Sequence, residues 1–215
     1  MSGLFVSFEG TEGSGKSTQM RLLVERLRRL NWNVVTNQEP GGTPIGAQIR
    51  RILLDPTNAD ISPRAELLLM FASRAQAARQ VIEPALAAGA IVVSDRFTDS
   101  TLAYQGEARG LGFDLVREAH HVAVGPLLPD LTLCIEVPVA EGLARARVRN
   151  ESQTGPDESR IDRQSLDFHQ RVLHGYRRIA AEDPARFHLI DGRGDQDTVA
   201  ARVWAFVEAR LPVQP

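Results

Sequence analysis

The chain has 215 residues, of which 43% are hydrophobic and 24% are charged, and its formal net charge is −2 at pH 7. This composition is that of a globular protein and excludes a disordered, collagen-like or coiled-coil chain. The net charge favours neither a nucleic-acid nor a membrane partner, and no apolar run reaches the ~20 residues of a membrane span. The N-terminal residues lack the charged and apolar regions of a secretory leader, so we expect a single-domain cytoplasmic protein.

Two residue types occur once each in the sequence. Of the 25 basic residues all but Lys16 are arginine, and Cys134 is the single cysteine. A lone thiol forms no internal disulfide, which agrees with a reducing compartment. Because Cys134 lies in an apolar run, we expect a buried and unreactive thiol.

The first part of the chain alternates short apolar runs with helical patterns. Residues 4–8 predict a strand that ends at a glycine-rich turn, and residues 19–30 repeat Leu, Val and Met at helical spacing. Residues 33–36 predict a second strand. A turn-rich segment at 39–44 precedes a helix predicted over 45–54.

A long helical pattern follows in the middle of the chain. It begins at Ser62 and Pro63, an N-cap and first-turn pair, and runs to residue 88. Pro84 predicts a kink or a split in it. The remaining elements are predicted at residues 90–94, 131–137 and 187–190 as strands and at 199–211 as an amphipathic helix. Strands separated by helices indicate an α/β fold, a parallel sheet with helices on both faces.

One segment breaks this alternation. Residues 150–159 are polar and contain Gly155 and Pro156. On charge alone a solvated loop between two charged helices is the simpler interpretation, and a basic flap that closes over a polyanion is the alternative. The arginines on its two sides are Arg145, Arg147, Arg149, Arg160 and Arg163.

The first glycine-rich turn fits the pattern GxxxxGK[ST] between a strand and a helix. Glycines let the backbone wrap around a phosphate, and the following helix presents its positive end to it. Lys16 reaches the terminal phosphates, and the hydroxyl of Ser17 can ligate Mg²⁺. The candidate ATP-binding residues of this loop are Gly10, Thr11, Glu12, Gly13, Ser14, Gly15, Lys16, Ser17 and Thr18.

A second candidate element is the carboxylate at the end of the predicted strand 90–94. Asp95 is the carboxylate expected next to the metal ion, and Arg96 is the next residue. Ligands of open α/β sheets bind at the carboxyl ends of strands, and an arginine there can clamp a phosphate. We therefore expect Asp95 and Ser17 at the metal and Arg96 on a phosphate.

These segments occur together in one order: the phosphate loop, EPGGT at 39–43, DRF at 95–97, residues 100–106 and PDLT at 129–132. With this combination the chain closely resembles bacterial thymidylate kinases from about Phe5 to Asp191. The resemblance implies the P-loop NTPase fold in one domain over residues 1–215, with a mobile basic lid at about 145–163.

The family resemblance also implies an activity. These enzymes transfer the γ-phosphoryl group of ATP to dTMP, with Mg²⁺, and give dTDP and ADP for dTTP biosynthesis. They are usually homodimers, and we expect a homodimer here. Two other interpretations stay open: a different nucleotide kinase of the same fold, and a P-loop binding switch.

Several residues match the acceptor-binding positions of the family. Glu12 is at the position of the acidic loop residue that contacts the 3′-hydroxyl of the acceptor in the family. Glu39 and Pro40 would shape the site of the acceptor phosphate, which Arg50 and Arg96 would contact.

The base pocket is expected on two later segments. Arg74 would donate to the thymine ring. Four residues before it the family has an aromatic side chain, where this chain has Met70 followed by Phe71, and either could contact the base. The remaining matches are Thr101 and Gln105 on the base edge and Tyr104 at the position of a ribose 2′-hydroxyl.

The family places its catalytic arginine in the phosphate loop or in the lid. This phosphate loop has no arginine, so the lid must supply it, and this favours the flap interpretation of residues 150–159. We expect Arg149 and Arg160 near the transferred phosphate and Arg145 nearer the adenine. The predicted catalytic residues are Lys16, Asp95, Arg96, Arg149 and Arg160.

Overall fold

The computed structural model describes residues 3–152 and 156–212. All strand pairs in it are parallel, and the five strands lie in the order β2-β3-β1-β4-β5. The strands are β1 (Leu4–Glu9), β2 (Val34–Gln38), β3 (Ile91–Asp95), β4 (Leu131–Glu136) and β5 (Phe187–Asp191). The predicted parallel sheet is therefore confirmed, with each strand within two residues of its predicted bounds.

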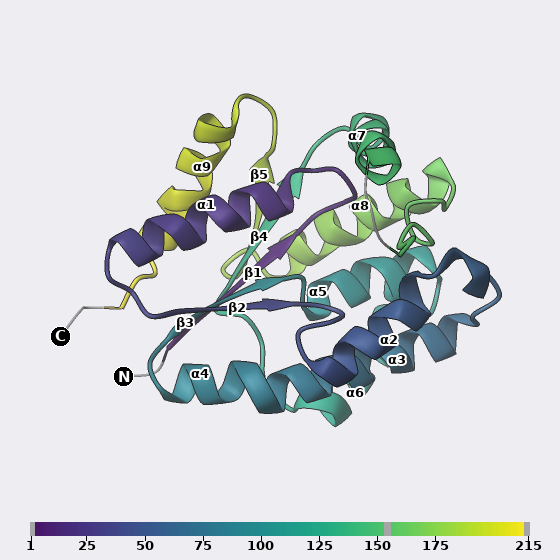
Figure 1. Cartoon of the computed structure of the whole chain (residues 1–215), viewed down its shortest axis with the longest axis horizontal. Helices are drawn as coiled ribbons and strands as arrows, with labels where there is room; N and C mark the ends of the chain where they lie inside the picture. The colour runs from purple at the N-terminus through teal and green to yellow at the C-terminus, as the bar shows by residue number, and fades with distance from the viewer. Residues whose placement is uncertain (1–2, 153–155, 213–215) are drawn as a thin grey trace.

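Helices cover both faces of this sheet (Figure 1). One layer is α1 (Lys16–Arg29) with α9 (Gln196–Glu208), which pack on each other. The other elements are α2 (Pro44–Leu54), a 3₁₀ turn (Pro56–Asn58), α3 (Pro63–Ala77), α4 (Glu83–Ala87), α5 (Thr98–Thr101), α6 (Phe113–Val124), α7 (Val139–Ser152) and α8 (Leu166–Glu182), and two π-helical turns at Ala78–Ile82 and Leu102–Ala108. None of the helices in the described residues is long and apolar enough to span a bilayer.

The core lies on both sides of the central strand. In β1, Leu4, Val6 and Phe8 pack with residues of α1 and α9, while Phe5 points to the other face and packs with Val92. Because both faces are covered, the inner strands β1, β3 and β4 are buried at nearly every position, whereas the edge strands β2 and β5 are buried only in part. Cys134 lies in this core, fully buried, as predicted.

The long helix predicted over residues 63–88 is interrupted. A π-helical turn at Ala78–Ile82 separates α3 from α4, directly before Pro84. Proline has no N–H for the helical ladder and clashes with the carbonyl four residues earlier, and a π turn accommodates both. The predicted distortion at Pro84 is confirmed.

The sheet order brings the two phosphate-related segments together. Phe8 and Asp95 pair at the carboxyl ends of β1 and β3. The chain leaves β1 toward one side of the sheet and β3 toward the other, which makes this the topological switch point where ligands of such sheets bind. The phosphate loop follows β1 and Arg96 follows β3, so both emerge at this point.

Candidate active site

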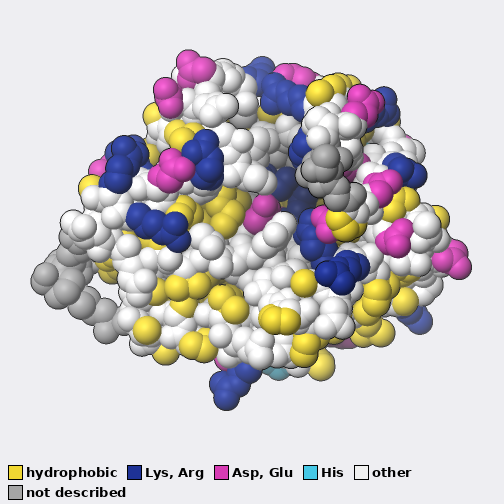
Figure 2. Space-filling view, viewed as in Figure 1, with side chains coloured by type: hydrophobic (Ala, Val, Ile, Leu, Met, Phe, Trp, Pro, Cys, Tyr) yellow, Lys and Arg dark blue, Asp and Glu magenta, His cyan; other side chains and the backbone are white. Residues whose placement is uncertain are grey.

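One cavity of about 300 Å³ lies at the switch point. Figure 2 shows Lys and Arg side chains gathered where the surface is hollowed beside the start of α1. The predicted residues that line the cavity are Glu12, Lys16, Ser17, Glu39, Pro40, Arg50, Met70, Arg74, Asp95, Arg96, Thr101, Tyr104, Gln105 and Arg149. Residues that the sequence analysis missed also line it: Gln38, Leu54, Ser100, Asn150, Glu158, Ile161 and Asp162.

The phosphate loop wraps between β1 and α1. Gly13 has a φ of 65°, and a Cβ on it would lie 2.0 Å from the carbonyl oxygen of Gly142 in α7. Lys16 Nζ donates to the carbonyl oxygens of Gly10 and Thr11, each at 3.0 Å. Burial, together with the charge of Arg96, lowers the pKa of Lys16 to about 8. The loop lysine thus lies across the loop, at the positive end of α1, where a triphosphate would bind.

The helix after the loop begins at Lys16, three residues before the predicted start. Gly15 precedes it with a φ of 95°. The apolar pattern cannot mark this first turn, because Ser17 and Thr18 lie outside the core there. In the same loop, the buried hydroxyls of Thr11 and Ser14 have no hydrogen-bond partner among the described residues, which fits groups that bind a ligand.

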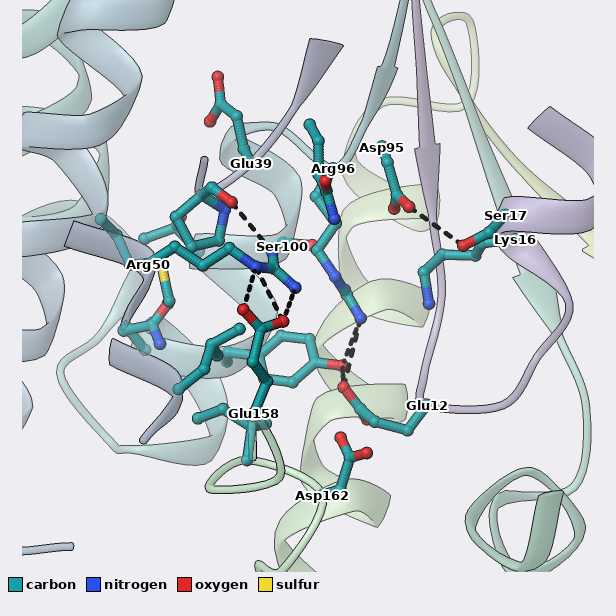
Figure 3. Close-up of a pocket in the computed structure, with 18 of the residues that line it drawn as sticks. Glu12, Lys16, Ser17, Glu39, Arg50, Asp95, Arg96, Ser100, Glu158 and Asp162 are labelled. Atoms are coloured by element: carbon teal, nitrogen blue, oxygen red, sulfur yellow. Dashed lines mark hydrogen bonds and ion pairs between the residues drawn. The ribbon is translucent and has the colours of Figure 1, made fainter. Parts of the chain in front are cut away.

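Two oxygen-bearing side chains lie together at the mouth of the loop. Ser17 Oγ donates to Asp95 Oδ2 at 3.2 Å (Figure 3). A hydroxyl and a carboxylate suit Mg²⁺, which keeps several water and phosphate ligands and takes few from the protein. The described residues contain no cluster of three or more His, Cys, Asp or Glu that could hold a metal.

Arg96 lies at the centre of the cavity and has a strained backbone. Its φ is 72°, in the left-handed region that an arginine seldom adopts, and its N–H donates to Phe8 O at 2.9 Å. Ser94 Oγ donates to its carbonyl oxygen at 2.7 Å. Such strain persists where the surroundings fix it, and it is often found at functional sites.

The guanidinium of Arg96 contacts four side chains. Its Nη1 donates to Ser100 Oγ at 2.8 Å and to Tyr176 OH at 3.0 Å. Its Nη2 donates to Glu12 Oε1 and to Tyr104 OH, each at 3.2 Å. Arg96 is therefore held in one orientation while still lining the cavity.

Glu12 is an acidic residue inside a phosphate-binding loop. Tyr104 OH donates to its Oε1 at 2.6 Å, and His169 Nδ1 lies 3.0 Å from its Oε2. Burial alone would raise the pKa of Glu12, but the close contact with His169 and the charges of Arg96 and Lys16 outweigh it and hold the pKa well below its ordinary value. Glu12 is thus an ionised hydrogen-bond acceptor facing the cavity.

A second buried carboxylate, Glu9, holds side chains that contact Arg96. Glu9, at the end of β1, accepts hydrogen bonds from Phe97 N at 2.8 Å, Tyr176 OH at 3.0 Å and the Ser100 hydroxyl. Burial, with the charge of Asp99, raises the pKa of Glu9 to about 7. Sequence analysis missed Glu9 and Tyr176. The available signal was a glutamate that ends a largely apolar strand.

Glu39 and Arg74 form a buried ion pair. Arg74 Nε and Glu39 Oε2 are 2.6 Å apart, and each side chain is 2% exposed. Arg74 Nη1 also donates to Thr101 Oγ1 at 3.0 Å and Nη2 to Phe97 O at 3.1 Å. Arg74 is therefore a fixed donor in the cavity wall, and Glu39 orients it.

Arg50 meets a carboxylate from the lid. Its Nη2 lies 2.7 Å from Glu158 Oε2, its Nε donates to both Glu158 oxygens at 3.0 Å, and its Nη1 donates to Pro40 O at 3.0 Å (Figure 3). A bidentate carboxylate presents the same oxygen geometry to arginine as a phosphate does. Glu158 thus binds Arg50 where an acceptor phosphate is predicted.

The structure separates Met70 from Phe71. Met70 lines the cavity. Phe71 is buried in the core with Leu67 and Leu102, and its ring packs edge-on against His120. Of the two open choices, Met70 is therefore the side chain that faces the pocket.

The lid arginines lie in three different places. Arg149 lines the cavity and pairs with Asp162 at 3.0 Å. Arg145 is half exposed on α7 and pairs with Glu141. Arg160 does not line the cavity: it is buried, with Nη2 2.6 Å from Glu66 Oε2. Residues 153–155 of the predicted lid lie outside the described residues.

Comparison with known proteins places this geometry in a family. The family model described as thymidylate kinase matches residues 8–203. A thymidylate kinase of Syntrophotalea carbinolica is 48% identical over 200 residues and covers 93% of each chain, and one of Synechococcus sp. is 48% identical over 212 residues, with 98% of this chain and 97% of its own covered. The crystal structure of thymidylate kinase from Ehrlichia chaffeensis superposes with a TM-score of 0.77 at 30% identity, over 96% of this chain and all of the other. The chain belongs to the thymidylate kinase family.

Proposed function

We propose that the chain transfers the γ-phosphoryl group of ATP to dTMP, giving dTDP and ADP, as a Mg²⁺-dependent step in dTTP biosynthesis. The observation that carries this proposal is that Lys16 of the phosphate loop lines the same cavity as Arg50 and Arg96. We propose that Lys16 binds ATP and that the two arginines bind the acceptor phosphate. The family membership names the acceptor as dTMP.

The reaction needs no general base. The acceptor oxygen belongs to a phosphate that is already ionised, because its second pKa is about 6. This oxygen attacks the γ-phosphorus, and the bond from that phosphorus to the β-bridging oxygen breaks. Catalysis is then positioning and charge neutralisation between two polyanions.

The proposed roles follow the contacts. Lys16 holds the terminal phosphates of ATP, and Arg96 lies between them and the acceptor. Ser17 and Asp95 are the residues that would hold Mg²⁺, and the ion would supply positive charge that neutralises the phosphates. Glu12 accepts a hydrogen bond from the 3′-hydroxyl of the acceptor. Tyr104 fills the position that a ribose 2′-hydroxyl would occupy.

The lid supplies the remaining positive charge. We assign this role to Arg149 rather than to Arg160, because Arg149 lines the cavity and Arg160 is bound to Glu66. Arg145, four residues before Arg149 and so on the same face of α7, is proposed at the adenine. We propose that the described parts of the lid, residues 145–152 and 156–163, move within a single domain.

The same proposal includes a homodimer in the cytoplasm, where ATP is available. Support for the dimer comes from two neighbouring helices, α3 and α6, which pack against each other. Leu68 on α3 is 65% exposed and Val122 on α6 is 88% exposed. We propose that these two exposed apolar side chains lie in the surface that a second copy covers.

The test is an ADP-release assay with ATP and Mg²⁺ against dTMP, dUMP, dCMP, dGMP, dAMP and ribo-TMP. We expect dTMP to lead. If another monophosphate leads, the chain is a different nucleotide kinase and the base pocket is wrongly assigned. ATP consumption that does not depend on any monophosphate would contradict the transfer reaction itself.

A further inference from the structure

Glu66 lies one turn into α3, at a position where a glutamate is typically exposed, yet it is fully buried. Gln105 Nε2 donates to its Oε1 at 2.7 Å. Arg109 donates to both of its oxygens at 3.2 Å, and Arg160 donates to Oε2 at 2.6 Å. Sequence patterns alone did not single out Glu66.

Glu66 is ionised in this setting. Burial alone would raise its pKa, but the hydrogen bonds from Arg109 and Gln105 outweigh burial and lower the pKa. An ionised carboxylate only accepts hydrogen bonds. The side-chain amide of Gln105 must therefore turn its NH₂ group toward Glu66.

This contact decides what Gln105 offers to the cavity. Gln105 lines the cavity, and no hydrogen bond engages its Oε1 within residues 3–152 and 156–212. With the NH₂ group held by Glu66, the oxygen is the group left for a ligand. Arg74, fixed by Glu39, Thr101 and Phe97, supplies donors in the same cavity.

The acceptor oxygen of Gln105 and the donor groups of Arg74 line the same cavity, and together they match a base edge that carries a donor next to an acceptor. Thymine and uracil carry an N3–H donor next to the O4 acceptor, whereas cytosine carries an N3 acceptor next to an N4 amino donor. We propose that Glu66 is a positioning residue for base selection: it fixes the Gln105 amide so that the pocket accepts a pyrimidine with N3–H and rejects cytosine. This inference rests on the proposed function, since it takes Gln105 to contact the base.

Glu66→Gln tests the inference because it reverses the amide. The two arginines keep the new amide oxygen at the Oε2 position, so the new NH₂ group faces Gln105. Gln105 must then turn its oxygen to residue 66 and its NH₂ group to the cavity. We expect the ratio of kcat/KM for dTMP over dCMP to fall by about 10–100-fold, because a buried donor then faces N3–H.

Two further variants separate selection from simple damage to the fold. Glu66→Gln combined with Gln105→Glu restores an acceptor toward the cavity, and the ratio should return toward that of the unchanged enzyme. Gln105→Met removes the amide, and Glu66→Gln added to it should leave the ratio unchanged. If Glu66 only stabilises the fold, Glu66→Gln would lower kcat/KM for dTMP and dCMP equally, and the double variant would not restore the ratio.

A matched control is Asp99→Asn. Asp99 is also a buried carboxylate paired with an arginine, Arg186 at 2.6 Å, and it does not line the cavity. Its loss should change the melting temperature without changing the dTMP to dCMP ratio. A shift of the ratio in this variant as large as that of Glu66→Gln would overturn the specific role of Glu66.

If Glu66→Gln does not fold, the unchanged enzyme carries the test by NMR. The side-chain amide resonance of Gln105, assigned by its loss in Gln105→Met, should be protected from exchange before and after dTMP is added. Free exchange of these protons overturns the inference. The proposed function fails separately, when the unchanged enzyme itself does not prefer dTMP over dCMP.

Discussion

Lys16 carries the only side-chain ammonium group of the chain, and every other cation near the phosphates is a guanidinium. Lys16→Ala removes the charge that would hold the terminal phosphates, so we expect turnover to fall by roughly 10³-fold or more. Circular dichroism and thermal melting should show an intact fold, because Nζ bonds only to loop carbonyls. Turnover near that of the unchanged enzyme would contradict the assignment of the phosphate loop.

The ring and the hydroxyl of Tyr104 have separable roles. The hydroxyl donates to Glu12 at 2.6 Å, so Tyr104→Phe should lower kcat/KM for dTMP by about 10-fold, the effect of one lost hydrogen bond to a charged group. Because the ring remains, the preference for deoxyribose should persist in this variant.

Tyr104→Ala removes the ring as well and should narrow the gap between dTMP and ribo-TMP. The measurement is the ratio of the two specificity constants in each variant. An unchanged ratio in Tyr104→Ala would show that the ring does not exclude the 2′-hydroxyl.

At the scale of elements, the lid helix contacts the phosphate loop through two glycines. A Cβ on Gly142 of α7 would lie 2.4 Å from Glu12 O. Alanine is a better helix former than glycine by ~1 kcal/mol, so sequence reasoning alone predicts that Gly142→Ala stabilises α7. We expect instead a loss of at least ~10-fold in kcat/KM, because the loop must shift to relieve the contact.

The exposed Ala144 on the same helix gives the matched control for this prediction. Ala144→Gly lowers helix propensity without touching the loop, and its kcat/KM should stay close to that of the unchanged enzyme. Full activity of Gly142→Ala would show that the loop tolerates the displacement.

Glu158 of the lid competes with the acceptor phosphate for Arg50. The two side chains form a partly exposed ion pair, and such pairs contribute up to ~1 kcal/mol to stability. Glu158→Gln should therefore lower the Kd of dTMP by about 2–5-fold, measured by calorimetry without ATP. Asp157→Asn on the same segment breaks a pair with Arg163 and should leave the Kd unchanged. Weaker binding in Glu158→Gln would mean that the carboxylate assists binding.

The sequence predicted these elements unevenly. The inner strands were readily found, because a parallel sheet buried on both faces makes them largely apolar runs, and the phosphate loop was found by its glycine-rich motif. The position of Arg160 could not be found, since its partner Glu66 lies 94 residues away and both look like ordinary surface charges. Met70 and Phe71 are adjacent, and only the tertiary packing shows which of them faces the core.

At the scale of the whole molecule, the proposed dimer has a direct test. Val122→Glu places a charge on the face of α6 that we propose for the dimer, and we expect the protein to elute as a monomer in light-scattering chromatography. Val148→Glu is the control: Val148 is 67% exposed on the lid helix, and its replacement should leave the dimer intact. A dimer that persists in Val122→Glu would place the interface elsewhere.

The single lysine has one more consequence for the chain as a whole. Apart from the N-terminal amine, Lys16 is the only amine that an acylating reagent can modify, and its pKa of about 8 makes it reactive in mild base. The extent of acylation at Lys16 therefore reports the accessibility of the phosphate loop. A protease that cleaves only after lysine has one site in the 215 residues, inside the phosphate loop. The rate of this single cleavage is a second measure of how accessible the loop is.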